Sequence, residues 1–173
     1  GQFRVIGRAH QAHGDGMAKL ADIADHMVML GGGQDADPLK AQLLGQIAEM
    51  DGPAYVRLGR LNIPVIYDEA ADIKLGKGSV VREGKDYTVI ACGLMVNEAM
   101  IAAETLAAEG IDIRIIDMHT IKPIDEEIIM KAAAETKGIV TAEEHSVIGG
   151  LGSAVAEVIC TKCPTKMAMV GGQ

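Results

Sequence analysis

The chain contains no tryptophan and only four aromatic residues, one Phe and three Tyr, among its 173 positions. Proteins that bind single-stranded nucleic acid stack bases on aromatic rings, and this chain has too few rings for such a surface. The formal net charge of −8 at pH 7 also argues against binding to a phosphate backbone or to an anionic membrane surface. We therefore expect no nucleic-acid partner.

Cysteine is also scarce. The chain has three, Cys92, Cys160 and Cys163, an odd and low number that is typical of a reducing compartment. No apolar run approaches the ~20 residues that a membrane helix needs, and no charged-then-apolar signal segment opens the chain. These features predict a cytoplasmic location without membrane contact. Because both ends resemble interrupted elements, we expect the chain to be part of a longer protein.

Apolar residues are abundant, at 49% of the chain, so a substantial core can form. With so few rings, this core must be aliphatic, and the ten methionines are expected to fill its gaps rather than to bind metal.

The second half of the chain alternates between two kinds of apolar pattern. Short β-prone runs are separated by segments with apolar residues at helical spacing, several of them closed by glycine. The strands are expected at 87–91, 111–116, 139–142 and 167–170, and the helices at 97–108, 126–136 and 153–161. Such alternation predicts an α/β fold with a doubly wound, mainly parallel sheet over residues 86–173.

The first half is less regular. A turn at Asp51-Gly52-Pro53 precedes a predicted strand at 54–58, and helices are predicted at 38–50 and, more weakly, at 17–24. A strand candidate lies at 27–30. This half is interpreted as part of a second α/β domain over residues 1–62, followed over residues 63–85 by a linker and a hairpin around Glu83-Gly84.

Polar residues concentrate in the stretch from Thr141 to Val155. Glu143, Glu144 and His145 follow an apolar run, and Gly149, Gly150 and Gly152 come just before a helix. Strand ends beside glycine-rich helix starts are where α/β proteins usually bind ligands or partners.

Three segments resemble the transketolase family. The run D-G-P-A-Y-V-R-L-G-R at residues 51–60 resembles the end of its pyrimidine-binding domain. The run I-D-M-H-T-I-K-P-I-D at 116–125, together with 141–155, is similar to its C-terminal domain. The form is closest to the separate C-terminal subunit of split transketolases.

The resemblance implies a thiamine diphosphate and Mg²⁺ enzyme of the pentose phosphate pathway, a transferase that moves two-carbon ketol units between sugar phosphates. Such enzymes form dimers, with the cofactor between a diphosphate-binding domain and a partner's pyrimidine-binding domain. The glutamate that activates the cofactor would lie upstream of this chain, so the resemblance implies no catalytic residue here and no cofactor bound to this fragment. The fragment alone is expected to be inactive, with a thiamine-diphosphate-binding domain or N-terminal subunit and a second copy as its partners.

Two residues are candidates for substrate binding by this resemblance. His10, in the G-R-A-H-Q segment at 7–11, would reach the sugar, although Ile6 and Arg8 depart from the family pattern and a solvated histidine is the alternative. Arg60, at the carboxyl end of the predicted strand 54–58, would hold the substrate phosphate by a two-pronged contact. The alternative for Arg60 is an ion pair with Asp51 or Asp68. Arg57 is interpreted as structural.

The remaining motifs favour structural roles. Glu144 and His145 are expected at a subunit contact, and Gly150 and Gly152 are expected to allow close packing of a helix on the sheet. No metal is expected, because Cys160 and Cys163 supply only two of the four ligands of a structural zinc.

Two other functions remain open. The chain could be a beta-type subunit of a 2-oxo acid dehydrogenase or a relative of deoxyxylulose-phosphate synthase. Residues 86–171 could instead form a flavodoxin-like interaction module without enzymatic activity.

Overall fold

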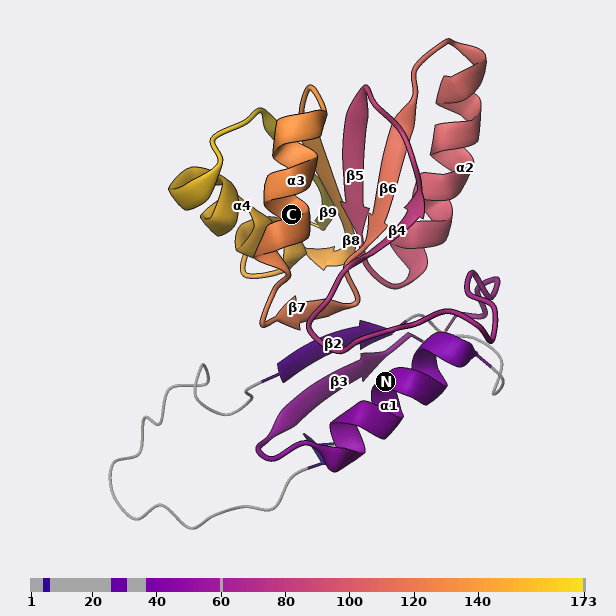
Figure 1. Cartoon of the computed structure of the whole chain (residues 1–173), viewed down its shortest axis with the longest axis vertical. Coiled ribbons are helices and arrows are strands. Elements are labelled where there is room, and N and C mark those ends of the chain that lie inside the picture. Colours follow the sequence, from indigo (N-terminus) through magenta and orange to yellow (C-terminus); the bar gives the residue numbers. More distant parts are fainter. Residues whose placement is uncertain (1–4, 7–25, 31–36, 60, 173) are drawn as a thin grey trace.

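The computed structural model describes residues 5–6, 26–30, 37–59 and 61–172, which form two sheets placed one above the other (Figure 1). The elements follow the chain in this order: β1 (Val5–Ile6), β2 (His26–Leu30), α1 (Pro38–Glu49), β3 (Ala54–Leu58), β4 (Ser79–Arg82), β5 (Tyr87–Ala91), α2 (Leu94–Ala108), β6 (Ile113–Asp117), β7 (Thr120–Lys122), α3 (Glu126–Glu135), β8 (Ile139–Ser146), α4 (Leu151–Lys162) and β9 (Met167–Gly172).

The larger sheet has the strand order β4-β6-β5-β8-β9. Strands β5, β6, β8 and β9 are parallel, and β4 pairs antiparallel with β6. Helix α2 covers one face, while α3 and α4 cover the other (Figure 1). Successive residues of β5 serve opposite cores, because Ile90 packs with α3 and α4 whereas Ala91 packs with α2. The predicted mainly parallel, doubly wound sheet is confirmed.

Local sequence signals account for several element ends. Pro38 opens α1, and the Asp37 side chain caps it by accepting from the Leu39 amide at 3.1 Å. Asp125 caps α3 by accepting from the Ile128 amide at 3.4 Å. Gly110 follows α2 with a φ of +82°, a conformation that glycine adopts without strain.

The smaller sheet has the order β1-β3-β2-β7. Strands β2 and β3 are parallel, and β1 and β7 pair antiparallel at its two edges. Helix α1 buries Leu43 and Ile47 in a core with Val28 and Leu30 of β2. Both sheets therefore contain parallel strands, four in the larger sheet and two in the smaller one.

Two parts of the topology differ from the sequence-based prediction. The hairpin expected within 78–87 is wrong, because β4 pairs with β6 rather than with its sequence neighbour β5. Strand β7 was not predicted, and it joins the smaller sheet although it comes from the predicted C-terminal domain. Strand β7 thus belongs to the lobe built on the smaller sheet, whereas its neighbours β6 and α3 belong to the lobe built on the larger sheet. The domain boundaries stay a prediction.

The linker between β3 and β4 crosses from one lobe to the other. Two glutamines of α1, one helical turn apart, bind it by hydrogen bonds. Gln42 donates to the Ala71 carbonyl at 2.8 Å and accepts from the Ile73 amide at 3.1 Å. Gln46 donates to the Ile73 carbonyl at 2.7 Å and accepts from the Leu75 amide at 2.8 Å. The two side-chain amides thus pair with the extended linker much as a neighbouring strand would.

None of the helices in the described part of the chain is both long and apolar enough to cross a membrane.

Candidate functional site

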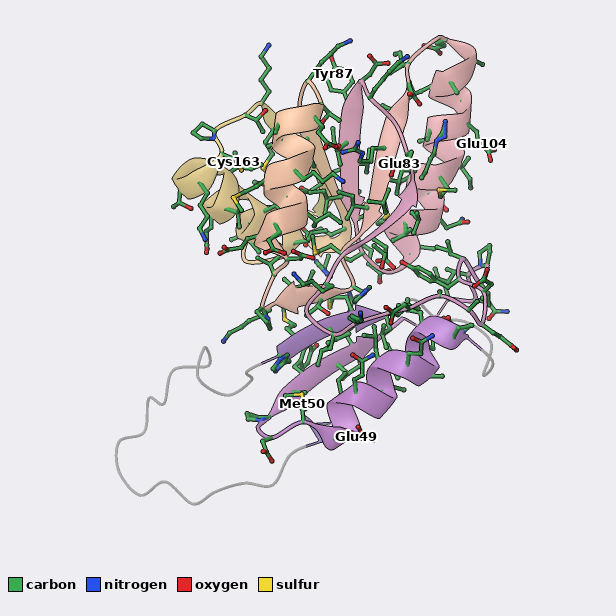
Figure 2. The ribbon with its side chains drawn as sticks, viewed as in Figure 1. Glu49, Met50, Glu83, Tyr87, Glu104 and Cys163 are labelled. Carbon is green, nitrogen blue, oxygen red and sulfur yellow. The ribbon has the colours of Figure 1, made fainter. Side chains whose placement is uncertain are left out.

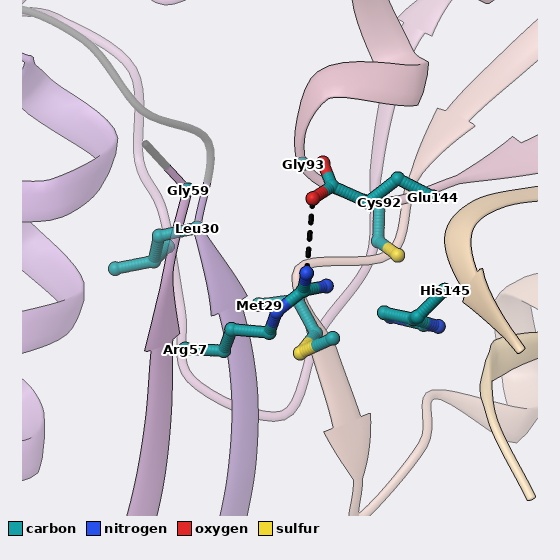
Figure 3. A pocket seen from close by; sticks show the side chains of 8 residues that line it. All are labelled: Met29, Leu30, Arg57, Gly59, Cys92, Gly93, Glu144 and His145. Atoms are coloured by element: carbon teal, nitrogen blue, oxygen red, sulfur yellow. Dashed lines mark hydrogen bonds and ion pairs between the residues drawn. The ribbon is translucent and has the colours of Figure 1, made fainter. Parts of the chain in front are cut away.

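The carboxyl ends of the parallel strands of both sheets meet at the junction between the lobes. Together they line a small crevice, with a cavity of ≈ 10 Å³ that has room for one water-sized group (Figure 3). Its lining comes from the ends of β2 and β3 (Met29, Leu30, Arg57 and Gly59) and from the ends of β5 and β8 (Cys92, Gly93, Glu144 and His145).

The topology of the larger sheet singles out this edge. From β5 the chain crosses through α2 to β6 on one side, and it later returns through α3 to β8 on the other side. The strand order therefore reverses between β5 and β8. In open α/β sheets, ligands bind outside the carboxyl ends of the strands at such a reversal.

An ion pair joins the two sheets across the crevice. Arg57 Nη2 of β3 donates to Glu144 Oε1 of β8 at 3.0 Å (Figure 3). Both side chains are one-third exposed, at 33% each, so solvent screens the pair and its contribution to stability is below about 1 kcal/mol. The structural role predicted for Arg57 stays a prediction, and the side chain lies between the lobes.

Glu143 of β8, next to the lining residue Glu144, binds the start of α4 and His145. Its carboxylate is 1% exposed and accepts from the Leu151 and Gly152 amides at the start of α4, both at 2.8 Å. It also contacts His145 Nδ1 at 2.7 Å. Charge-assisted bonds to a helix N-terminus satisfy two of the amides that have no partner within the helix.

The glycines before and within α4 make this arrangement possible. A Cβ at Gly150 would overlap the Glu143 carboxylate, and one at Gly152 would lie 2.9 Å from Met169 Sδ and 3.0 Å from Thr141 Oγ1. Both positions therefore need glycine for the close approach of α4 to β8 and β9.

Cys92 faces the crevice as a neutral thiol. It is 2% exposed, and burial, with the Glu143 charge as the next cause, raises its pKa to about 12. The thiolate is the nucleophilic form, so this cysteine is not an activated nucleophile.

A second polar contact ties the linker to the larger sheet. The Tyr67 hydroxyl donates to Asp117 Oδ2 at 2.8 Å at the end of β6. Asp117 is 2% exposed, and its Oδ1 has no hydrogen-bond partner among the described residues. Burial raises the pKa of Asp117 to about 7, and burial together with the Asp117 charge raises the pKa of Tyr67.

The structure brings together only some of the residues predicted from sequence. His10 and Arg60 lie outside the described residues, although Gly59, the neighbour of Arg60, lines the crevice. Glu144 and His145 lie on the crevice, where Glu144 pairs within the chain, and their predicted subunit contact stays a prediction.

Two further sequence motifs have no role in the crevice. Cys160 is an exposed residue of α4. Cys163 is half-buried just after this helix, away from the lobe junction (Figure 2). His119 is fully buried, its Nδ1 lies 3.1 Å from Thr120 Oγ1, and burial lowers its pKa to about 4. Its Nε2 has no hydrogen-bond partner in the described part of the chain.

Sequence reasoning missed Glu143 and Asp117. Glu143 was noted beside Glu144 but given no role, because the return of α4 onto β8 is visible only in the fold. Asp117 directly follows the predicted strand 111–116, a position at which exposed residues are common, and its contact with Tyr67 spans 50 positions of the chain.

The family model for the transketolase C-terminal domain matches residues 76–172. The chain is 48% identical to a 6-deoxy-6-sulfo-D-fructose transketolase subunit of Clostridium sp. (strain MSTE9), over 73% of this chain and 39% of the relative. It is 41% identical to a 1-deoxy-D-xylulose-5-phosphate synthase of Heliobacterium modesticaldum, over 68% of this chain and 18% of the relative.

A solved structure described as a split gene transketolase, inactive beta4 tetramer, matches with a TM-score of 0.79 and 42% identity. The match covers 84% of this chain and 47% of that chain. This chain thus spans less than half the length of the relatives and of the structure that it matches.

Proposed function

Since this chain belongs to the transketolase family, we propose that it is the C-terminal section of a split-type transketolase whose intact form transfers two-carbon ketol units between sugar phosphates. The observation that carries the proposal is the match to a split transketolase over 84% of the chain at 42% identity. The family model takes in little more than half of the chain, so this match also includes part of residues 1–75.

The geometry of the lobe junction supports a substrate site there. The carboxyl ends of β2, β3, β5 and β8 line one crevice, and Gly59, which precedes Arg60 in the sequence, is among its lining residues. We propose that Arg60 holds the substrate phosphate and that His10 contacts the sugar. A guanidinium beyond a strand end offers two parallel donors to a phosphate.

The proposed cofactor of the intact enzyme is thiamine diphosphate with Mg²⁺, which would supply the carbanion chemistry when bound. The described residues do not fit these groups. They contain no cluster of three His, Cys, Asp or Glu side chains suited to a metal ion. The groove of ≈ 560 Å³ along α3 and α4 sets Glu126 and Glu157 against one lysine, which is unfavourable for a diphosphate. We propose that another section of the enzyme holds the cofactor.

The proposed partners follow from this division. An N-terminal section would bring the thiamine diphosphate site, and two or more copies of the complete subunit would assemble in the cytoplasm. The solved split transketolase is described as a tetramer. The 173-residue chain alone is expected to be inactive.

The test mixes the chain with a separately produced section that carries the whole upstream part of the enzyme, including the activating glutamate, and adds thiamine diphosphate and Mg²⁺. It measures glyceraldehyde 3-phosphate released from xylulose 5-phosphate in the presence of ribose 5-phosphate. Activity in the mixture and none in either section alone supports the proposal. Ketol transfer by the chain alone, or no transfer once both sections are shown to associate, contradicts it.

The similarity to a deoxyxylulose-phosphate synthase supports a second candidate. That enzyme would consume pyruvate with glyceraldehyde 3-phosphate instead of a ketose donor. The same mixture supplied with pyruvate separates the two functions, and it also reports the 2-oxo acid decarboxylation expected of a dehydrogenase subunit. No association with any thiamine section would favour an interaction module.

A further inference from the structure

The linker between β3 and β4 runs between the two lobes at the carboxyl end of β6 (Figure 1). Two successive linker residues pack into different lobes. Ile66 packs with the core that α2 covers, whereas Tyr67 packs with the core of the smaller lobe. The hydroxyl of Tyr67 nevertheless donates to Asp117 Oδ2 of the larger lobe at 2.8 Å. One side chain therefore joins the two lobes through a single carboxyl group.

A second carboxyl group comes from the smaller lobe. Asp37, which caps α1, lines the same cavity of ≈ 20 Å³ as Tyr67 and Asp117. Asp37 is 8% exposed and Asp117 is 2% exposed. A cavity of this size has room for about one water. Two ionised carboxylates would therefore share a space with little solvent, where like charges disfavour each other's ionised form.

The surroundings of Asp117 offer little compensation for a negative charge. Its Oδ1 accepts no hydrogen bond among the described residues. The nearest basic group given to this cavity is Lys40, whose Nζ lies 4.0 Å from Asp37. Cys92, just after β5, is a neutral thiol. The side chains that β4 and α2 place beside Asp117 carry no charge: Ser79, Gly93 and Val96. Burial, together with the charge of Asp37, raises the pKa of Asp117 to about 7.

We propose that Asp117, Tyr67 and Asp37 form a pH-sensitive latch between the two lobes. While Asp117 is protonated, its neutral carboxyl accepts from Tyr67 and lies across the cavity from Asp37 without repulsion. When Asp117 releases its proton to solvent, its charge is poorly solvated and shares the cavity with a second carboxylate. The lobes then part at the linker, and water reaches the Asp117 carboxylate. The latch does not depend on the activity proposed above.

The direction of the response follows from linkage. The closed junction, in which the pKa of Asp117 is about 7, is stabilised fully below the ordinary pKa of 3.8. This stabilisation is lost as pH rises through 7, because an open junction lets Asp117 ionise freely. From these two values, the fraction of molecules with an open junction should rise about tenfold between pH 6 and pH 8 and level off at higher pH.

Cys92 provides a probe of the open junction. It is 2% exposed, lines the crevice between the lobes and packs in one cluster with Met29 of the smaller sheet. With Cys160 and Cys163 replaced by alanine, Cys92 is the only thiol of the 173-residue chain. Its rate of labelling by a soluble thiol reagent then measures how often the lobes part. Because the reactivity of an exposed thiol also depends on pH, each rate is divided by that of D117N in the same background.

The ratio of labelling rates, parent over D117N, should rise about tenfold from pH 6 to pH 8. D72N is the matched control, because it removes a carboxylate that is 78% exposed, and its labelling should follow that of the parent. Low concentrations of urea should accelerate labelling less steeply than they promote global unfolding, since opening exposes only the surface at the junction. A ratio that stays constant with pH, or a urea dependence equal to that of global unfolding, would overturn the inference.

A carbon NMR titration of the Asp117 carboxyl in the parent chain tests the latch even if D117N does not fold. The midpoint should lie near 7. It should fall in D37N, because asparagine still caps α1 but carries no charge. A midpoint in the ordinary range of an exposed aspartate, or the same midpoint in D37N and the parent, would contradict the latch.

Discussion

Replacing Asp117 with asparagine should change how the stability of this protein depends on pH. Asp117 is 2% exposed at the end of β6, and among the described residues its carboxyl has one hydrogen bond, from the Tyr67 hydroxyl at 2.8 Å. Burial raises its pKa from 3.8 to about 7, and the charge of Asp37 acts in the same direction. The folded state therefore holds the proton of Asp117 over a pH range in which the unfolded chain has already lost it.

The sign follows from linkage. A group whose pKa is higher in the folded state stabilises the fold fully below its unfolded pKa, and this stabilisation is lost as pH rises through the folded pKa. At about 1.36 kcal/mol for each unit of pKa, the whole loss between pH 3 and pH 8 is about 4 kcal/mol. About 3 kcal/mol of this loss falls between pH 5 and pH 8.

The assay is urea unfolding followed by circular dichroism, for the parent chain and D117N at pH 5 and pH 8. Asparagine cannot ionise and still accepts from Tyr67, so the stability of D117N relative to the parent should rise by about 3 kcal/mol from pH 5 to pH 8. Taking this difference cancels other titrations, such as that of buried His119, whose lowered pKa weakens the fold toward acid pH.

D72N is the matched control, because the Asp72 side chain is 78% exposed, and its stability relative to the parent should stay within about 0.5 kcal/mol at both pH values. A D117N difference that changes by less than 1 kcal/mol, or that falls with rising pH, would refute the reasoning (~1 kcal/mol being the resolution of the method).

Three further changes test the packing around the junction. G152A should destabilise the chain by about 1–3 kcal/mol because its Cβ would press on Met169 and Thr141. The control G45A on α1, where nothing lies within 4 Å of an added Cβ, should stabilise the chain by up to about 1 kcal/mol. Equal shifts of the two variants in thermal unfolding would contradict this. Q46A should lower the free energy of unfolding by about 1–3 kcal/mol and speed the hydrogen exchange of the amides at 73–77, since it leaves two backbone groups of the linker unpaired. Unchanged exchange would show that Gln46 does not hold the linker against α1. R57A should change the free energy of unfolding by less than about 1 kcal/mol, and a loss above about 2 kcal/mol would mean that the ion pair is better shielded than its exposure implies.

Most of the larger sheet follows from local patterns. In β6, Ile113 and Ile115 alternate with Arg114 and face the core with α2, and in α3 the Asp125 cap marks the start of the helix. These signals lie within a few residues of each other and need no tertiary information. This is why the helices of residues 86–173, and all their strands except β7, could be located from sequence to within a few positions.

The rest depends on contacts between distant segments. Strand β7 has only three residues, too few for a periodic signal, and it is a strand because β2 lies beside it. The expected hairpin around Gly84 does not form because β4 pairs with β6 instead of β5. Gly84 serves the close approach of the β4–β5 connection to β6, since a Cβ there would overlap the backbone of Ile113. Turn residues alone cannot tell which strand is paired.

The candidate site shows the same division. The sequence indicated that Glu144 and His145 lie at a strand end beside a glycine turn, which is where the crevice is found. It could not show that Arg57, 87 positions away, reaches Glu144, nor that Glu143 is sealed under α4 and positions the His145 ring. Those relations arise only when the two sheets are brought together.

The central claim is that this chain completes the substrate site of a transketolase formed with an N-terminal section. The most direct test is the rate of ketol transfer from xylulose 5-phosphate to ribose 5-phosphate by the two sections together, comparing R60A with K131A, a change on the exposed side of α3. The account predicts ketol transfer by the parent mixture. It predicts at least a tenfold higher KM for xylulose 5-phosphate with R60A, which corresponds to about 1.4 kcal/mol of lost phosphate binding, and an unchanged KM with K131A. Equal KM values for R60A and the parent, or transfer that does not require this chain, would contradict it.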